Sequence, residues 1–208
     1  MSKIKPRWEW RTFGQAFGKP EEKIKQYKEV SFKKSEEKYI LSKMSIENIK
    51  IRDDLMDIKS LKQINGDKLE QWSPVMKESF PISKDKLEIL FRDYFKVSAP
   101  KFSQETYTYQ ETYTYTEFLD LVVECDHQLR IVDVYKERHI YEINQNTVEI
   151  AETSFNRVPM RTICVEHTDP ANVINTVREL GLEGLPNINY INAMKTAVGM
   201  GNYIGMSD

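Results

Sequence analysis

Large apolar and charged residues alternate along several segments in the first third of the chain. The segments are WEWRTF at 8–13, KYILSK at 38–43, ENIKIR at 47–52 and LMDIKSLKQI at 55–64. Alternation with a period of two residues is typical of β-strands that present one face to a core. Asp53 and Asp54 stand between the last two segments and predict a tight hairpin turn.

The second half of the chain predicts three further strands. They are LRIVDVYKERHIYEI at 129–143, NTVEIAETSF at 146–155 and MRTICVEH at 160–167, with a turn at 144–146. The stretch around 97–116 carries the near-repeat TYTYQETYTYTEF. Alternating Tyr and Thr favour an extended strand or hairpin, and an aromatic binding face is the alternative.

Helical signals are fewer. A short helix and an exposed connection are expected in the Lys- and Glu-rich stretch at 19–38. Ser83 is a candidate N-cap for a helix with Leu87, Leu90, Phe91 and Tyr94 on its apolar side. Asp169, Pro170 and Gly181 bound a second helix, and a last helix is expected at 191–198. Because strands and helices do not alternate as βαβ units, we expect one α+β domain over 1–208.

Composition excludes several classes of protein. The net charge of −2 does not suit a chain built to bind nucleic acid, and no segment has the length of a membrane span. Two cysteines, Cys125 and Cys164, are too few for a disulfide framework. We therefore expect a cytoplasmic protein with reduced thiols. The sequence leaves the oligomeric state open, a homodimer included.

Charged residues recur on single faces of the predicted strands. The pairs are Glu9 with Arg11, Lys50 with Arg52, Asp57 with Lys59, and Lys136 with Arg138. A sheet with one solvated face shows the same alternation, so exposed charges are one interpretation. If these faces instead line the inside of a barrel, several cations share one enclosed space, which is costly without a polyanion. Arg and Lys in such a space match phosphate oxygens.

The order of these features resembles the CYTH superfamily, also called triphosphate tunnel metalloenzymes. The matching pieces are Glu9-x-Arg11, the hairpin IKIRDDLMDIKSL, Lys136-x-Arg138, the strand VEIAET, the strand with Glu166, the helix ending ELGL, and NINYINAMK. The resemblance implies an eight-stranded antiparallel β-barrel tunnel with flanking helices, holding a triphosphate-containing small molecule or inorganic polyphosphate with Mg2+ or Mn2+. It places phosphate on Arg11, Lys50, Arg52, Lys59, Lys136 and Arg138, and metal on Glu9 and Glu166, with Glu149 or Glu152 as a further acid.

Two positions depart from the family pattern. The first strand of the family reads E-x-E-x-K, whereas this chain has Arg7-x-Glu9-x-Arg11. The strand with Glu166 carries Cys164 where a second acid is usual, and Cys164 alone is interpreted as a buried, inert thiol.

Four hypotheses follow, in this order. The first is a metal-dependent triphosphatase, and the second is a class IV-type adenylate cyclase that uses the same phosphate clamp. The third, supported by Arg7 and Cys164 and ranked close behind the first, is a non-catalytic sensor of nucleotides or polyphosphate. The fourth is an interaction domain with its charges on the outside.

Overall fold

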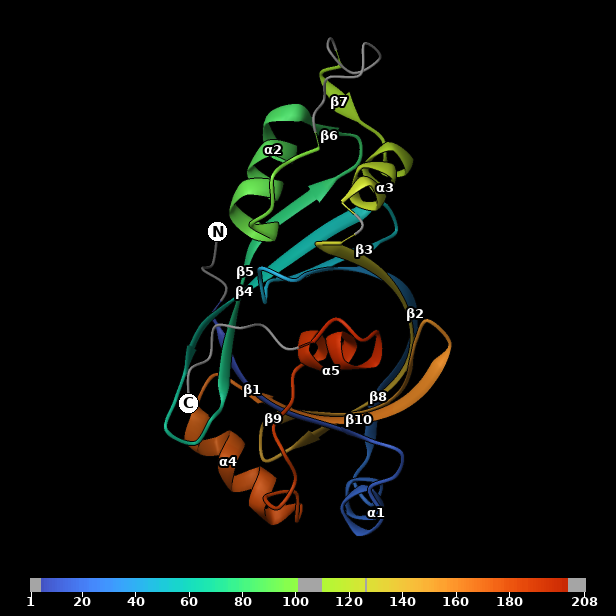
Figure 1. The fold of residues 1–208 in the computed structure, drawn as a ribbon. Coiled ribbons are helices and arrows are strands. Elements are labelled where there is room, and N and C mark those ends of the chain that lie inside the picture. Colours follow the sequence, from blue (N-terminus) through green and yellow to red (C-terminus); the bar gives the residue numbers. More distant parts are fainter. Residues whose placement is uncertain (1–4, 101–109, 126, 202–208) are drawn as a thin grey trace.

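The computed structural model describes residues 5–100, 110–125 and 127–201, and its central feature is a closed antiparallel barrel of eight strands. Figure 1 looks into the ring of strands. Around the barrel the order is β1-β10-β9-β8-β2-β3-β4-β5, and β5 pairs with β1 to close it. The strands are β1 (Arg7–Gly14), β2 (Glu29–Ser42), β3 (Asn48–Arg52), β4 (Leu55–Ile64), β5 (Glu70–Ser79), β8 (Leu129–Ile143), β9 (Asn146–Phe155) and β10 (Val158–His167). The predicted α+β class and eight-stranded barrel are confirmed.

Hairpin turns set the strand register. Asp53 and Asp54 have φ values of 51° and 55°, and Asn144 and Gln145 have 50° and 64°. Two successive left-handed residues twist a two-residue loop in the sense that antiparallel strands need, and Asp and Asn tolerate this backbone well. The predicted turns at these two places are therefore confirmed.

Helices cover the outside of the barrel. They are α1 (Lys19–Ile24), α2 (Lys84–Ile89), which runs into a π-helix (Leu90–Phe95), α3 (Tyr115–Glu124) and α4 (Pro170–Glu179). The outer faces of β3 and β4 pack on α2, the π-helix and α3, and the outer faces of β1, β9 and β10 pack on α4. Trp8 and Trp10 belong to the second of these cores. The outward residues that pack on these helices are thus apolar, and the charged residues that alternate with them face the inside.

The capping signals at Ser83 and Asp169 are confirmed. Ser83 accepts a hydrogen bond from the backbone N–H of Lys86, and Asp169 accepts one from Ala171. Gly181 has a φ of +74° just after the end of α4, where glycine avoids the strain of a side chain. Within the described residues, no helix is long and apolar enough to cross a membrane.

The Tyr/Thr-rich stretch differs from its prediction. Part of it lies outside the described residues, and the described part forms only the two-residue strand β7 (Thr112–Tyr113), which pairs with β6 (Ile82–Ser83). Thr114 then caps α3, because its side chain accepts from the backbone N–H of Glu117 while the Glu117 carboxylate accepts from the N–H of Thr114. This reciprocal capping box overrides the strand propensity of the repeat.

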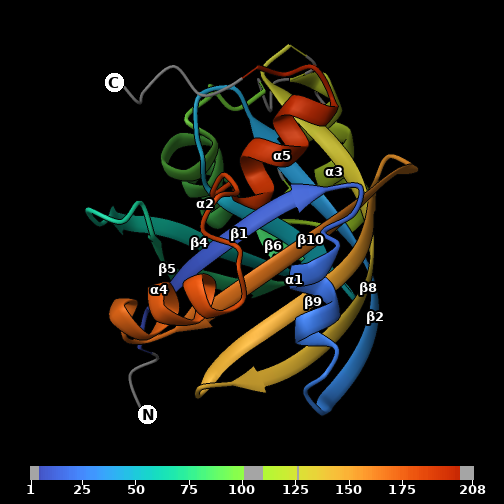
Figure 2. The same cartoon turned by 90° about the horizontal axis from the view of Figure 1, so that it is seen from below.

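One helix lies inside the ring of strands. It is α5 (Tyr190–Ala197), framed by the barrel in Figure 1 and close to one end of it in the perpendicular view of Figure 2. Tyr190, Ile191 and Met194 pack on inward residues of β2, β8 and β9. This apolar cluster fills one end of the barrel, and the remaining interior is polar.

Candidate functional site

Five of the predicted cations line one cavity inside the barrel, which we call the tunnel. Its open space is about 100 Å³. The cations are Arg11, Lys50, Lys59, Lys136 and Arg138, and the carboxylates on the same wall are Glu9, Glu149 and Glu166. They come from β1, β3, β4, β8, β9 and β10, so strands distant in sequence contribute to one site.

Arg11 is held by acids on two strands. Its Nε donates to Oε1 of Glu9 at 2.9 Å, and one terminal nitrogen donates to Oε1 of Glu149 at 3.2 Å and to the hydroxyl of Thr162 at 3.2 Å. The side chain of Arg11 is only 6% exposed. A buried arginine fixed in this way presents a rigid charge to the tunnel.

Lys136 is equally buried but has a different partner. Its Nζ donates to Oε2 of Glu37 at 2.8 Å and to the hydroxyl of Tyr39 at 2.7 Å. Burial lowers the pKa of Lys136 to about 8, although the charge of Glu37 acts in the opposite direction. Burial tends to raise the pKa of Glu37, but Lys136 and Lys50 bring it down to about 2.

The remaining cations are less tightly paired. Lys50 lies 3.7 Å from Asp57, and Arg138 lies 3.9 Å from Glu149. Burial lowers the pKa of Lys50, with Glu37 opposing. The Nε of Arg138 is buried and has no hydrogen-bond partner among the described residues. These groups can therefore accept new anionic partners with little loss of existing contacts.

Arg52 lies at the edge of the tunnel rather than inside it. Its side chain is 43% exposed and lies 3.5 Å from Glu37 and 3.8 Å from Asp53. It lines an adjoining cavity of about 460 Å³ together with Lys33 and Arg138. Because Lys33 stands opposite Arg138 in the β2–β8 register, both side chains leave their strands on the inner face. The cationic wall therefore continues outward from the tunnel.

Three of the four acids predicted to bind metal face the tunnel, and the fourth lies on the outer face of its strand. Glu9 and Glu166 are directly opposite each other on β1 and β10, and Glu149 on β9 faces the same space. Burial raises the pKa of Glu166, and the neighbouring Glu9 adds to this effect. Burial acts to raise the pKa of Glu9, but the neighbouring Arg11 outweighs burial and lowers it. Glu152 has the opposite parity, is 64% exposed and lies 3.5 Å from Arg161, so the structure does not bring it to this group.

Arg7 and Cys164 both face these acids. Arg7 lies 3.3 Å from Oε2 of Glu166, and the thiol of Cys164 contacts Oε1 of the same residue at 3.7 Å. The thiol is 1% exposed, as expected, but it points at carboxylates rather than into an apolar core. Burial raises its pKa well above the ordinary value for a cysteine.

Sequence reasoning missed several residues of the tunnel. Glu37 and Tyr39 face inward because β2 begins at Glu29, earlier than its apolar run suggests. Glu70 on β5 is 8% exposed and accepts from Trp72 and Asn189. Extending the alternation of KYILSK backward would have placed Glu37 on the same face as Tyr39. The contact between Glu70 and Asn189 had no local signal in the sequence.

Tyr190 is the contribution of α5 to the tunnel. The Cζ atom of Arg11 lies 4.6 Å and the Nζ atom of Lys136 lies 4.1 Å from the centre of its ring. Cations over a tyrosine face are stabilised by the ring quadrupole. Its hydroxyl is buried without a partner among the described residues, and burial raises its pKa well above the usual range. The hydroxyl is therefore a neutral donor with no acceptor.

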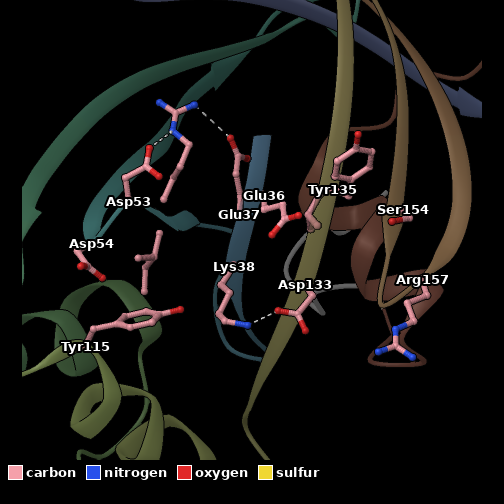
Figure 3. A pocket seen from close by; sticks show the side chains of 13 residues that line it. Glu36, Glu37, Lys38, Asp53, Asp54, Tyr115, Asp133, Tyr135, Ser154 and Arg157 are labelled. Carbon is pink, nitrogen blue, oxygen red and sulfur yellow. Dashed lines mark hydrogen bonds and ion pairs between the residues drawn. The ribbon is translucent and has the colours of Figure 1, made fainter. Parts of the chain in front are cut away.

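A second cavity, beside the turn at Asp53 and Asp54, shows the contrast. Figure 3 shows this cavity of about 540 Å³, with Tyr115 of α3 on one side and Asp133 and Arg157 on the other. Lys38 pairs with Asp133 there, and Glu36, Asp53 and Asp54 add acids. The acids at least balance the cations in this cavity, so it lacks the cationic excess that would mark a polyanion site.

Solved structures provide the comparison with known proteins. The putative adenylyl cyclase HpAC1 from Hippeastrum, described as having a dominant triphosphatase activity, aligns over 92% of this chain and 96% of its own, with 10% identity and a TM-score of 0.50. A putative adenylate cyclase from Bacillus halodurans covers 89% of this chain and 95% of its own at 15% identity, with a TM-score of 0.46. A search for a matching protein family and a search of curated proteins each gave no match.

This chain shares the fold of HpAC1, with a closed eight-stranded barrel at its centre. The resemblance read from the sequence is confirmed at the level of the fold. The roles of individual residues in the tunnel remain predictions, because likeness at 10% identity concerns the fold alone.

The inner acids suit a divalent cation. Glu9, Cys164 and Glu166 each offer one ligand atom, and these atoms lie within 4.8 Å of one another. Carboxylate oxygens are the usual protein ligands of Mg2+, which is held by one or two of them with water and phosphate oxygens. The donor set thus fits a dication shared with a phosphate chain.

Proposed function

We propose that the tunnel binds a triphosphate or linear polyphosphate and that the chain hydrolyses a phosphoanhydride bond with a divalent metal ion. The observation that carries this proposal is the convergence of Arg11, Lys50, Lys59, Lys136 and Arg138 on one enclosed cavity. Crowded, partly desolvated cations are costly unless anions compensate them. Several phosphate groups in a row provide that compensation, and arginine binds phosphate oxygens in a bidentate way.

Ligand binding would replace ion pairs between tunnel residues by contacts between these residues and phosphate. The open space is about 100 Å³, and its wall carries ion pairs such as Arg11–Glu149. A cavity of this volume holds several water molecules. A phosphate chain would displace that water and take over donors of Arg11, Lys136 and Arg138. The unpaired Nε of Arg138 and hydroxyl of Tyr190 support such an exchange, because both would gain an acceptor.

The acids would hold the metal. Glu9 and Glu166 would be its main ligands, with Glu149 nearby, and the ion would supply positive charge at the phosphate and a more acidic water. The tunnel cations orient the phosphate chain and stabilise charge on its oxygens. In the reaction a water oxygen forms a bond to phosphorus while the bridging P–O bond breaks, the leaving phosphate keeps the electron pair, and the proton lost by the water passes to solvent.

The comparison favours hydrolysis over cyclisation. HpAC1 is described as a putative adenylyl cyclase with a dominant triphosphatase activity. For this chain, cyclisation of ATP is the alternative that uses the same cations. A second candidate is a non-catalytic sensor, favoured by the ion pair between Arg7 and Glu166, which occupies a carboxylate that the metal needs.

Product analysis separates these activities. Purified protein is incubated with tripolyphosphate or ATP and with Mg2+ or Mn2+, and orthophosphate, diphosphate and cyclic nucleotide are quantified. We expect orthophosphate release that stops in EDTA and falls at least about tenfold in Glu166→Gln, consistent with the usual loss on removing a metal-site group. Glu152→Gln, which changes an exposed carboxylate of the neighbouring strand, is the matched control and should keep full activity. Cyclic nucleotide as the main product would favour the cyclase, and binding without turnover would favour the sensor.

A further inference from the structure

A thiol stands among the carboxylates of the tunnel. Cys164 precedes Glu166 by two residues on β10, so both side chains leave the strand on the same face. Glu9 reaches the same place from β1, where it lies opposite Glu166. The thiol sulfur and one oxygen from each carboxylate all lie within 4.8 Å of one another.

Two arginines bind the carboxylates of this group. Arg11 donates to Oε1 of Glu9, and Arg7 donates to Oε2 of Glu166. The thiol of Cys164 contacts the other oxygen of Glu166, Oε1, at 3.7 Å. Arg7 therefore orients Glu166 without occupying the oxygen that contacts the sulfur.

A second feature shows that this part of the interior is prepared for a ligand. The hydroxyl of Tyr190 is buried, lines the same tunnel and has no acceptor among the described residues. The guanidinium of Arg11, the residue that fixes Glu9, lies over the face of the Tyr190 ring. A phosphate chain reaching Tyr190 and Arg11 would lie beside the sulfur and the two carboxylates, where its oxygens could complete the coordination of an ion.

The ligand atoms determine which metal ion the site prefers. Thiolate ligands favour Zn2+ and related softer ions, whereas Mg2+ and Mn2+ prefer oxygen. Sulfur is therefore a poor substitute for an acid at a magnesium site. We propose that Glu9, Cys164 and Glu166 form a metal site in which Cys164 coordinates as a thiolate, so that the tunnel takes Zn2+ or Co2+ in preference to Mg2+.

This inference rests on the proposed function, because the phosphate chain supplies the remaining ligands. On binding, the S–H bond of Cys164 breaks, its proton leaves to the buffer, and a sulfur–metal bond forms with no change of oxidation state. The thiolate also restores at this place the negative charge that Arg7 offsets. The site therefore still binds a dication, although Arg7 lies next to one of its carboxylates.

Cobalt reports the sulfur–metal bond directly. Metal-free protein with tripolyphosphate is titrated with Co2+, and thiolate-to-cobalt charge transfer is followed in the near ultraviolet. The matched control is Cys125→Ser, which removes the half-buried thiol after α3 and leaves Cys164 as the chain's single cysteine. We expect the band in wild type and in Cys125→Ser, where it can arise from Cys164 alone. Its absence from Cys125→Ser would overturn the proposal, and this result needs no substitution inside the tunnel.

Competition experiments then measure the preference. Calorimetry should show that Cys164→Ser weakens Co2+ binding at least about tenfold and Mg2+ binding less than about threefold, since only the softer ion uses the sulfur. Cys164→Asp should reverse the order and favour Mg2+. Equal losses for both ions, or tighter Mg2+ than Co2+ binding in wild type, would contradict the proposal.

The outcomes also separate this inference from the proposed function. Calorimetry with tripolyphosphate and Mg2+ on the same protein tests whether the tunnel binds a phosphate chain, independently of the role of Cys164. If tripolyphosphate binds but no thiolate band develops with Co2+, the thiolate site is wrong and the polyphosphate tunnel stands. If tripolyphosphate does not bind either, both proposals fail.

Discussion

Lys136 and Glu37 form an ion pair inside the barrel, with 2.8 Å between Nζ and Oε2. The two side chains are only 6% and 1% exposed. A buried pair of this kind contributes little net stability, but removing one partner leaves an uncompensated charge in a low-dielectric interior. The pair therefore holds a buried cation at the tunnel wall.

Removing the acid should be costly. We expect Glu37→Gln to lower the free energy of unfolding by about 3 kcal/mol, the usual effect of breaking a buried pair. Urea unfolding followed by circular dichroism measures it. Glu152→Gln changes an exposed pair and should cost less than about 1 kcal/mol. Equal stability of wild type and Glu37→Gln would show that the pair does not form.

The stability difference should depend on pH. The pKa of Glu37 is lowered to about 2 from 4.5. The ionised carboxylate therefore stabilises the folded state fully above pH 4.5, and this contribution is lost as pH falls toward 2. Unfolding of wild type and Glu37→Gln at several pH values should show their difference shrinking over that interval. A difference that grows on acidification would contradict the assignment.

Ligand affinity should fall in mildly alkaline solution. Because burial lowers the pKa of Lys136 to about 8, its charge is lost as pH rises through that value, while tripolyphosphate loses none of its negative charge. Calorimetry between pH 7 and pH 10 should show progressive weakening. Lys136→Arg keeps its charge throughout and should flatten the profile. Identical profiles for the two proteins would show that Lys136 does not contact the ligand.

Arg7 should oppose metal binding. Arg7→Glu removes a cation that pairs with Glu166 at 3.3 Å and places a carboxylate nearby. We expect Mn2+ affinity to rise about tenfold, because a like charge near a dication is replaced by an opposite one. Arg157→Glu makes the same charge change on the outer side of the barrel and is the control. Equal gains in both variants would mean that net charge alone is responsible.

The hydroxyl of Tyr190 offers a test with little structural cost. Tyr190→Phe removes a buried donor that has no partner among the described residues, so stability should stay within about 0.5 kcal/mol or rise slightly. Tripolyphosphate affinity should fall about tenfold, the value of a hydrogen bond to a charged acceptor. Unchanged affinity would remove Tyr190 from the binding site while leaving the cations in place.

Much of the fold could be predicted because its signals are local. The alternation in NIKIR and VYKERH predicted that Lys50 shares a face with Arg52 and Lys136 with Arg138, although not that this face is inward, and the turns at Asp53 and Asn144 predicted the hairpins. Parity also separates Glu149 from Glu152, which stand three residues apart on one strand. The resemblance alone had left that choice open.

The elements that were missed depended on competing or distant interactions. Pro74 interrupts the pattern of β5, and strand prolines usually argue against a strand unless a bulge or edge accommodates them. The Thr114–Glu117 capping box was a local signal for α3 that the Tyr/Thr alternation concealed. The position of α5 inside the barrel depends on contacts between residues over 30 positions apart, so no periodicity could show it.

The most direct test of the central claim is the affinity of the tunnel for a phosphate chain. Isothermal titration with tripolyphosphate is compared for wild type, Arg138→Ala, Arg52→Ala and, as control, Arg178→Ala on the outer helix α4. We predict saturable binding that weakens at least about tenfold in Arg138→Ala, the value of lost hydrogen bonds to a charged ligand. The loss should be smaller in the half-exposed Arg52→Ala and absent in Arg178→Ala, with stability unchanged or raised by about 1 kcal/mol in the tunnel variants as cation repulsion is relieved. Equal affinity in wild type and Arg138→Ala would contradict the account.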